Sequence, residues 1–142
     1  MGLRLGSKEL ANEFWRLQKA GDPEFIEAFK GLNIRLILLG TDAPGKEDKQ
    51  LFLHIENGQF VEITPETKPA PSDLRTRPFD HTKYDCRASA PQKTLVDLCN
   101  GRIDLIEAIS KVKIEGDIGK LMSQFAEFMK FITYLGKKGI EP

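Results

Sequence analysis

Residues 51–64 read LFLHIENGQFVEIT and carry the clearest secondary-structure signal in the chain. Two apolar runs, at 51–56 and 60–64, flank Asn57 and Gly58. An Asn-Gly pair between apolar runs is the strongest short-range signal for a β-hairpin, because both residues tolerate the positive φ angles of a tight turn. The stretch therefore predicts two antiparallel strands.

Three further strands are predicted around this hairpin. Residues 32–39 (LNIRLILL) form an apolar run that is too short for a typical helix and ends in the turn-rich segment 40–48, which favours a central strand. Residues 80–90 alternate with period two, as a strand with one buried face does, and residues 111–115 (KVKIE) alternate in the same way. Four prolines lie within 65–78, so this segment is predicted to be an exposed loop.

Two N-terminal helices have recognisable start signals. Ser7 precedes a stretch with apolar residues at helical spacing, so a helix is expected over about 8–20. Asp22 followed by Pro23 provides an N-cap and a favoured first residue for a second short helix.

Two more short helices are expected between the last two predicted strands. Ser89 and Gln92 have the spacing of a capping box ahead of a helix over 91–99. Asp104 and Glu107 repeat this spacing ahead of the next helix.

The composition is typical of an ordinary globular domain. The 142 residues include 21 basic and 21 acidic side chains, so the formal net charge is zero. Proteins that bind nucleic acid through its phosphates normally show a basic excess, and we therefore expect no nucleic-acid partner. The chain has no run of 18 apolar residues and no signal-peptide pattern, so neither a membrane span nor secretion is expected. Cys86 and Cys99 are interpreted as reduced thiols of a cytoplasmic protein.

The segment after Asp117 predicts the most apolar helix of the chain, reaching Tyr134 or Leu135 and stopped by Gly136. At 100° per residue its apolar side chains span roughly 220°, whereas a surface helix needs little more than about 100°. Such a helix has to be covered on two sides. The sheet can cover one side, and the other requires a helix, a partner chain or a ligand.

Sulfur and aromatic side chains share one stripe of this helix. Met122 and Met129 lie seven residues apart with Phe125 between them. Thioethers and aromatic rings form an adaptable lining for irregular apolar shapes. Periodicity alone leaves both plain core packing and ligand lining open.

Residues 101–117 (GRIDLIEAISKVKIEGD) resemble the signature of the sterol carrier protein type-2 family. The shared features are a turn at Gly101, a short helix, a strand that bears Lys113, and the pair Gly116-Asp117 before a terminal hydrophobic helix. The order of elements over about 24–135 is also similar. The resemblance implies an α+β fold in which a five-stranded, largely antiparallel sheet is covered by helices, with an apolar tunnel between the sheet and the C-terminal helix.

The resemblance also implies a function without covalent chemistry or a cofactor. Members of the family bind fatty acyl chains, acyl thioesters, phospholipids or sterols, so we expect binding and transfer of a hydrophobic ligand. Residues 1–142 would form a single lipid-binding domain, with N-terminal helices over about 8–30 and a sterol-carrier-like core over about 24–135. A polar head group would meet Lys111, Lys113 or Arg102. The expected lining residues are Met122, Phe125, Met129 and Ile132, followed by Phe128, Phe131, Phe25 and Phe29.

An enzyme is one competing class of function. Its candidate groups are His54, His81, Cys86 and Cys99. His81 and Cys86 lie five residues apart on one predicted strand, so they would face opposite sides of the sheet. The chain has no metal-binding or nucleotide-binding motif, and we expect neither a catalytic site nor a metal site.

A protein interaction module is the other competing class. In this alternative a second subunit, as in a homodimer, covers the wide apolar arc of the last helix. The charged pairs Lys137 with Lys138 and Lys111 with Lys113 are interpreted as solvated, with transient contact to an anionic membrane surface as the alternative.

Overall fold

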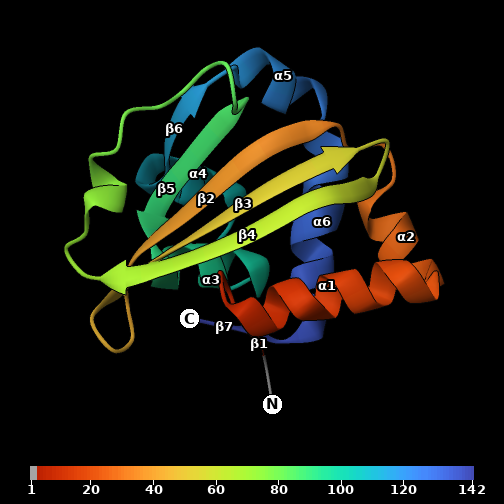
Figure 1. Cartoon of the computed structure of the whole chain (residues 1–142), viewed down its shortest axis with the longest axis horizontal. Coiled ribbons are helices and arrows are strands. Elements are labelled where there is room, and N and C mark those ends of the chain that lie inside the picture. The colour runs from red at the N-terminus through yellow and green to blue at the C-terminus, as the bar shows by residue number, and fades with distance from the viewer. Residues whose placement is uncertain (1–2) are drawn as a thin grey trace.

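A five-stranded mixed sheet forms the centre of the computed structural model, which describes residues 3–142 (Figure 1). Its strand order is β4-β3-β2-β5-β6, in which β2 and β5 are parallel and the other neighbours are antiparallel. This arrangement confirms the predicted α+β class and shows that the sheet is not purely antiparallel. The strands are β2 (Ile34–Ala43), β3 (Glu47–Glu56), β4 (Gln59–Pro69), β5 (Cys86–Pro91) and β6 (Lys113–Gly116).

Helices cover one face of this sheet. In Figure 1, α6 lies behind the sheet, where it packs against α2 and α3, while α1 runs along β4. A short parallel pair that the sequence did not predict, β1 (Leu3–Arg4) with β7 (Ile140–Glu141), joins the two ends of the described chain. The helices are α1 (Lys8–Ala20), α2 (Pro23–Phe29), α3 (Gln92–Cys99), α4 (Leu105–Lys111), α5 (Ile118–Ser123) and α6 (Phe125–Lys138), with a 3-10 turn η1 (Asp73–Arg75).

The predicted hairpin is confirmed. Glu56 pairs with Gln59, which leaves Asn57 and Gly58 as a two-residue turn with φ angles of 50° and 78°. A Cβ atom on Gly58 would lie 2.9 Å from the carbonyl oxygen of Phe29, so glycine also lets the hairpin tip approach the end of α2.

The two central strands are longer than predicted. Most of the predicted turn segment 40–48 belongs to β2 and β3, and residues 44–46 connect them. A bulge in β2 holds Asp42 at a φ of 53°. The carboxylate of Asp48 accepts a hydrogen bond from the Asp42 N–H at 3.1 Å, which stabilises a conformation that residue preferences alone would assign to a loop.

The predicted proline-rich loop over 65–78 is partly strand. β4 continues through Pro65 to Pro69. Because β4 is an edge strand, a residue without an N–H group is tolerated there. The following residues, 70–85, form an arm that reaches across to β5 (Figure 1).

The arm, residues 70–85, covers the sheet face opposite α6. Its Leu74 is fully buried, and the ring of Tyr84 lies 5.0 Å from that of Phe52 on β3. Phe52 pairs with Ile37 on β2. Leu36 and Leu38, on either side of Ile37, point to the helix-covered face, so Ile37 and Phe52 point to the opposite face. The arm therefore closes a second, smaller apolar layer.

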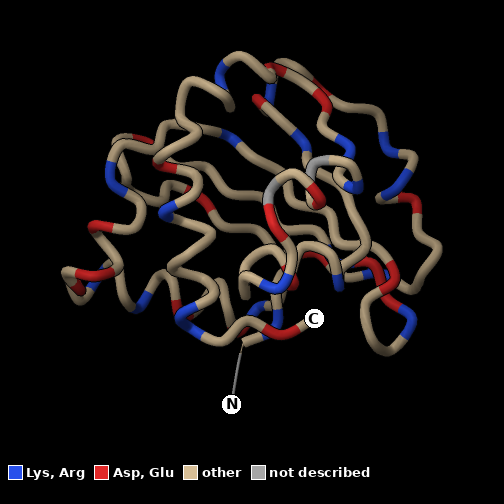
Figure 2. The backbone as a smooth tube through the Cα atoms, turned by 180° about the vertical axis from the view of Figure 1, so that it is seen from behind, with Lys and Arg blue, Asp and Glu red and all other residues tan. Residues whose placement is uncertain are grey.

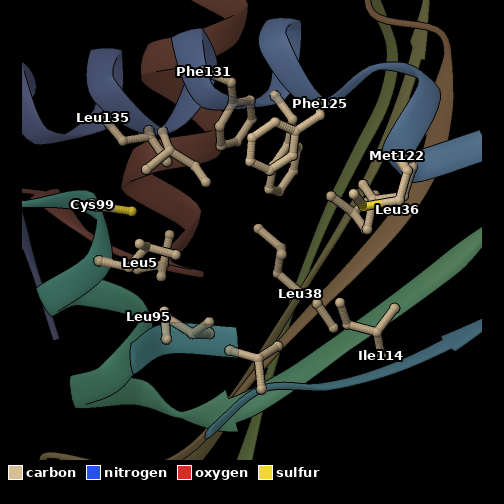
Figure 3. A pocket seen from close by; sticks show the side chains of 17 residues that line it. Leu5, Leu36, Leu38, Leu95, Cys99, Ile114, Met122, Phe125, Phe131 and Leu135 are labelled. Atoms are coloured by element: carbon tan, nitrogen blue, oxygen red, sulfur yellow. The ribbon is translucent and has the colours of Figure 1, made fainter. Parts of the chain in front are cut away.

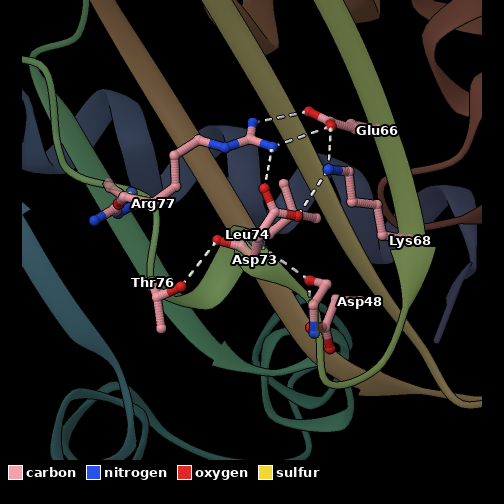
Figure 4. A network of polar contacts seen from close by, with 9 residues as sticks. Asp48, Glu66, Lys68, Asp73, Leu74, Thr76 and Arg77 are labelled. Atoms are coloured by element: carbon pink, nitrogen blue, oxygen red, sulfur yellow. Dashed lines mark hydrogen bonds and ion pairs between the residues drawn. The ribbon is translucent and has the colours of Figure 1, made fainter.

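Charged side chains fasten the arm to the sheet. The fully buried Asp48 accepts hydrogen bonds from Arg75 Nε at 2.8 Å and from Ser72 Oγ at 2.7 Å. These hydrogen bonds, that from Arg75 above all, hold the pKa of Asp48 well below its usual range. Two further ion pairs link β4 to the arm (Figure 4), Lys68 with Asp73 and Arg77 with Glu66, and Arg77 also pairs with Asp73 within the arm.

The strand predicted over 80–90 begins only at Cys86. The carboxylate of Asp80 accepts hydrogen bonds from the Thr82 N–H at 2.9 Å and the Thr82 hydroxyl at 2.6 Å. Such a local turn competes with extended backbone. His81 lies in this turn, so the prediction that it shares a strand with Cys86 is wrong.

The start signals of the N-terminal helices are confirmed. Ser7 Oγ accepts a hydrogen bond from the Leu10 N–H at 3.1 Å, which caps α1. Asp22 Oδ1 accepts one from the Phe25 N–H at 2.9 Å, which caps α2.

Only one of the two predicted capping boxes caps a helix. Asp104 Oδ1 accepts a hydrogen bond from the Glu107 N–H at 2.8 Å ahead of α4. Ser89 instead lies within β5, and Pro91 is the N-cap of α3 without a side-chain hydrogen bond. Gln92 is buried and donates to a backbone carbonyl of the N-terminal segment at 2.7 Å.

The predicted C-terminal helix is divided into α5 and α6. Gln124 separates them with φ −113° and ψ 23°. The Asn33 N–H donates to Gln124 Oε1 at 2.7 Å, and Gln124 Nε2 donates to the Asn33 carbonyl at 2.8 Å. This long-range clamp to the start of β2 fixes the break, and helical periodicity gives no sign of it.

Gly136 does not end α6, which continues to Lys138 and ends at Gly139 with a φ of 77°. A Cβ atom on Gly136 would lie 2.1 Å from the carbonyl oxygen of Cys99. Glycine at 136 therefore allows α3 and α6 to cross closely, and does not stop the helix.

Candidate ligand cavity

An apolar cavity of about 120 Å³ lies between the sheet, α3, α4, α5 and α6 (Figure 3). Its lining comes from eight separate parts of the chain, including the segment after β1. The lining residues are Leu5, Leu36, Leu38, Ala88, Leu95, Leu98, Cys99, Ala108, Val112, Ile114, Leu121, Met122, Phe125, Phe128, Phe131, Ile132 and Leu135.

Strand alternation and small residues create this hollow. Leu36 and Leu38 are two residues apart on β2, so both point to the helix-covered face. Ala88 on β5 and Ala108 on α4 place only methyl groups against the space. Longer side chains at these two positions would fill it, and the cavity therefore depends on where the sequence carries alanine.

Among the lining residues that the structure describes, no side chain is charged or contains oxygen or nitrogen. The heteroatoms of the lining are the sulfur atoms of Cys99 and Met122. Burial raises the pKa of the Cys99 thiol to about 12, so this group is neutral near pH 7. A cavity of this kind excludes water and suits hydrocarbon.

Five of the eight predicted lining residues lie at the cavity: Met122, Phe125, Phe128, Phe131 and Ile132. The other three do not. Phe25 and Phe29 belong to a cluster of aromatic rings between α1, α2, β4 and α6, in which their ring centroids are 4.7 Å apart. α2 packs against α6, where Phe29 contacts Tyr134 and also Phe131, and the ring of Phe131 lies between the aromatic cluster and the cavity.

Met129 faces a second hollow, a groove of about 440 Å³ between α6 and the connection from α3 to α4. The groove shares Leu98, Cys99 and Ile132 with the cavity. Four polar or charged side chains line the groove, Asn100, Asp104, Thr133 and Lys137, and the rest of its lining is Gly101, Ile103 and Gly136.

Sequence reasoning missed the part of the lining that lies outside the last helix. Leu36, Leu38 and Ile114 belong to predicted strands, and the alternation in those strands already places them on one face. That alternation does not specify which face the last helix covers. The two alanines give no signal, since an alanine beside a cavity has the same sequence pattern as one in a filled core.

The cavity reaches the surface at α5. The side chain of Met122 lines the cavity and is nevertheless 58% exposed, and Ile118, one turn earlier, is 51% exposed. Figure 3 places Met122 and Cys99 at opposite ends of the hollow. The cavity is therefore elongated, with an outer end at α5 and an inner end at α3.

The cations proposed for a head group lie outside the cavity lining. Lys111 Nζ pairs with Glu107 at 3.1 Å, and Arg102 pairs with Asp97 at 3.4 Å. Lys113 on β6 is exposed. Positions with positive and negative charge are interspersed around the whole fold (Figure 2).

The candidate catalytic groups are dispersed. The buried Cys86 thiol donates to the carbonyl of Asp117 at 3.1 Å, and burial is the main cause that raises its pKa. His54 Nε2 lies 3.2 Å from Glu56 on the sheet face away from the cavity, and the exposed His81 packs against the ring of Phe79. Within residues 3–142, no cluster of three or more His, Cys, Asp or Glu side chains could hold a metal ion.

None of the helices in residues 3–142 has the length and hydropathy needed to cross a membrane.

The fold has counterparts among solved structures, although no protein-family model and no curated protein matches the sequence. A conserved hypothetical protein of Thermus thermophilus, described as possibly a sterol carrier protein, is 14% identical with a TM-score of 0.67, covering 99% of this chain and 94% of its own. A crystal structure of sterol carrier protein 2 is 13% identical with a TM-score of 0.66, covering 96% of this chain and 100% of its own. The chain thus has the fold of sterol carrier protein 2.

Proposed function

We propose that this protein binds the hydrocarbon part of a lipid in the cavity without covalent chemistry and releases it unchanged. The observation that carries this proposal is the lining, which consists of apolar side chains from many separate parts of the chain. Burial of methylene groups supplies the driving force, at roughly 0.8 kcal/mol for each. The similarity in fold to sterol carrier protein 2 agrees with this role.

The size of the cavity favours a thin, flexible acyl chain over a rigid ring system. Its volume of about 120 Å³ is below the roughly 300–1,000 Å³ that is usual for sites which enclose whole ligands. A flexible chain can occupy such a space segment by segment, whereas a fused-ring sterol has to fit as one body. Fatty acids, acyl thioesters and phospholipids all offer such a chain.

The polar end of the ligand stays outside the cavity. The lining offers no hydrogen-bond partner other than a neutral thiol, and burying an unpaired carboxylate or phosphate costs several kcal/mol or more. Met122 is the residue best placed to admit the chain, because it is exposed, lines the cavity and has a side chain with three rotatable bonds.

The alternative, a protein interaction module, has less support. The inner side chains of α6, Phe131, Ile132 and Leu135, are at most 5% exposed within the single chain. α2 and α3 pack against α6. The breadth of the apolar arc therefore does not call for a second subunit.

Titration with a fluorescent fatty acid tests the proposal. We expect saturable uptake at one site per chain, and organic extraction of freshly purified protein followed by mass spectrometry should recover a lipid. Light scattering measures the oligomeric state in the same sample. A dimeric protein without uptake and without extracted lipid would contradict lipid binding and favour the interaction module.

A further inference from the structure

Three side chains separate the cavity from the neighbouring groove. Leu98, Cys99 and Ile132 line both hollows. Leu98 and Cys99 come from the end of α3, and Ile132 comes from the middle of α6. Burial alone accounts for the raised pKa of the Cys99 thiol, which agrees with a sulfur atom that lies between apolar surfaces.

The backbones on the two sides of this boundary are fixed against each other. Gly136 packs so closely on α3 that a Cβ atom there would lie 2.1 Å from the carbonyl oxygen of Cys99. The two helices therefore cannot approach further, and only the side chains of Leu98, Cys99 and Ile132 lie between the two hollows. Cys99 has the smallest side chain of the three boundary residues, and its sulfur points into the cavity (Figure 3).

The two hollows differ in size in a way that suits a long chain. The cavity, at about 120 Å³, holds only part of such a chain, whereas the groove offers about 440 Å³. The groove continues the apolar lining with Ile103 and Met129. A chain that enters beside Met122 runs towards Cys99, because these residues lie at opposite ends of the cavity.

We propose that the groove is the second compartment of the ligand site and that Cys99 sets the length of acyl chain that the site accepts. This inference rests on the proposed function. A chain longer than the cavity passes between Cys99 and Ile132, and its distal methylene groups lie against Met129 and Ile103. The ligand class is then a long unbranched acyl chain, and short chains use the cavity alone.

A chain-length series tests this proposal. Saturated fatty acids from octanoate to hexadecanoate compete with a fluorescent fatty acid for wild-type protein and for Cys99→Phe, Cys99→Ala and Cys99→Ser. In the wild type we expect affinity to rise roughly threefold to fourfold for each added methylene beyond the cavity length. Cys99→Phe should narrow the passage and lower the preference for hexadecanoate over octanoate, measured as the ratio of the two affinities in that variant, at least tenfold. Cys99→Ala and Cys99→Ser, which keep the passage open, should retain the wild-type slope.

A second measurement needs no variant. Alkylation of Cys99 in the wild-type protein at pH 9, followed by mass spectrometry of the labelled peptides, reports access to the boundary. Saturating hexadecanoate should slow the labelling of Cys99 at least tenfold, and saturating octanoate should slow it by a smaller factor.

The outcomes separate this inference from the proposed function. If wild-type protein binds octanoate but its affinity does not rise with longer chains, the lipid-binding function stands and the second compartment is ruled out. An unchanged slope in folded Cys99→Phe, or equal protection of Cys99 by both acids, also overturns it. Absence of uptake for every acid refutes both proposals.

Discussion

Replacing Ala88 with leucine should weaken acyl-chain binding while making the empty protein more stable. Ala88 lies on β5, is 8% exposed and contributes a methyl group to the cavity wall. The substitution places three more carbon atoms in the hollow. Met129 is among the lining residues expected from the sequence, but it faces the groove, so a substitution that fills the cavity has to be made elsewhere, here on β5.

Both effects can be estimated from the structure. Three carbon atoms displace roughly three methylene groups of the ligand, which at about 0.8 kcal/mol each lowers binding by about 2.4 kcal/mol, or roughly 60-fold. An empty cavity costs about 24 cal/mol for each Å³, so filling roughly half of the 120 Å³ should raise the free energy of unfolding by about 1.4 kcal/mol.

Ala90→Leu is the matched control. Ala90 lies two residues further along β5, points to the same face and is 5% exposed, but it does not line the cavity. Leucine there overpacks a filled core and should lower stability by about 1–3 kcal/mol with little change in the affinity of the remaining folded protein. The assays are fluorescent fatty-acid titration and urea unfolding. Folded Ala88→Leu with wild-type affinity would refute the assignment of the cavity as the ligand site.

Three further predictions concern the elements that hold the fold together. Asp48→Asn should lower the free energy of unfolding by about 2 kcal/mol, because the half-buried Arg75 loses the charge of the buried carboxylate to which it donates. A loss below about 0.5 kcal/mol in urea would show that the arm is not held there. The pKa of Asp48 in the folded protein lies below its unfolded value of about 3.9, so the stabilisation by its carboxylate is present above about pH 4 and is lost as the pH falls further. In acid titrations the free energy of unfolding of the wild type should therefore approach that of Asp48→Asn. Gly136→Ala should cost on the order of 3 kcal/mol, since the added Cβ meets the Cys99 carbonyl at 2.1 Å, and a wild-type unfolding midpoint would contradict the close crossing. The thiols of Cys86 and Cys99 should react with a disulfide reagent far more slowly at pH 8 in native protein than in urea. The reason is that burial raises the pKa of Cys99 to about 12 and also raises that of Cys86. Equal rates in the two conditions would contradict this shielding.

The features that the sequence predicted correctly are those encoded by neighbouring residues. The caps at Ser7 and Asp22 involve atoms three residues away, and the Asn57-Gly58 turn needs only its own backbone angles. Interactions of this range are visible in a short window of sequence.

The features that the sequence missed depend on distant partners. Gln124 breaks the last helix because it bonds to Asn33, which is 91 residues away. The sequence predicts a helix stop at Gly136, and only the position of α3 shows that it is a contact residue. The turn-like segment before Asp48 is strand because a buried carboxylate stabilises its bulge.

The same difference between local and long-range interactions holds for the candidate site. Periodicity placed Met122, Phe125, Phe128, Phe131 and Ile132 on apolar positions of the last helix, and all five lie at the cavity. Periodicity does not show which apolar side chains of α6 contact α2 and which line the cavity. Phe25 and Phe29 are expected as lining only from the family resemblance, and the structure places them in an aromatic cluster instead.

The most direct test of lipid binding is to locate the bound chain by NMR. Isotope-filtered NOE spectra of ¹³C-labelled protein with unlabelled hexadecanoate detect which protein methyl groups lie near the acyl methylenes. We expect cross-peaks to the methyl groups of Leu38 and Ile114 in the cavity and none to Val61, which is 51% exposed on the edge strand β4. Cross-peaks to surface methyl groups such as that of Val61, with none from Leu38 or Ile114, would contradict the account.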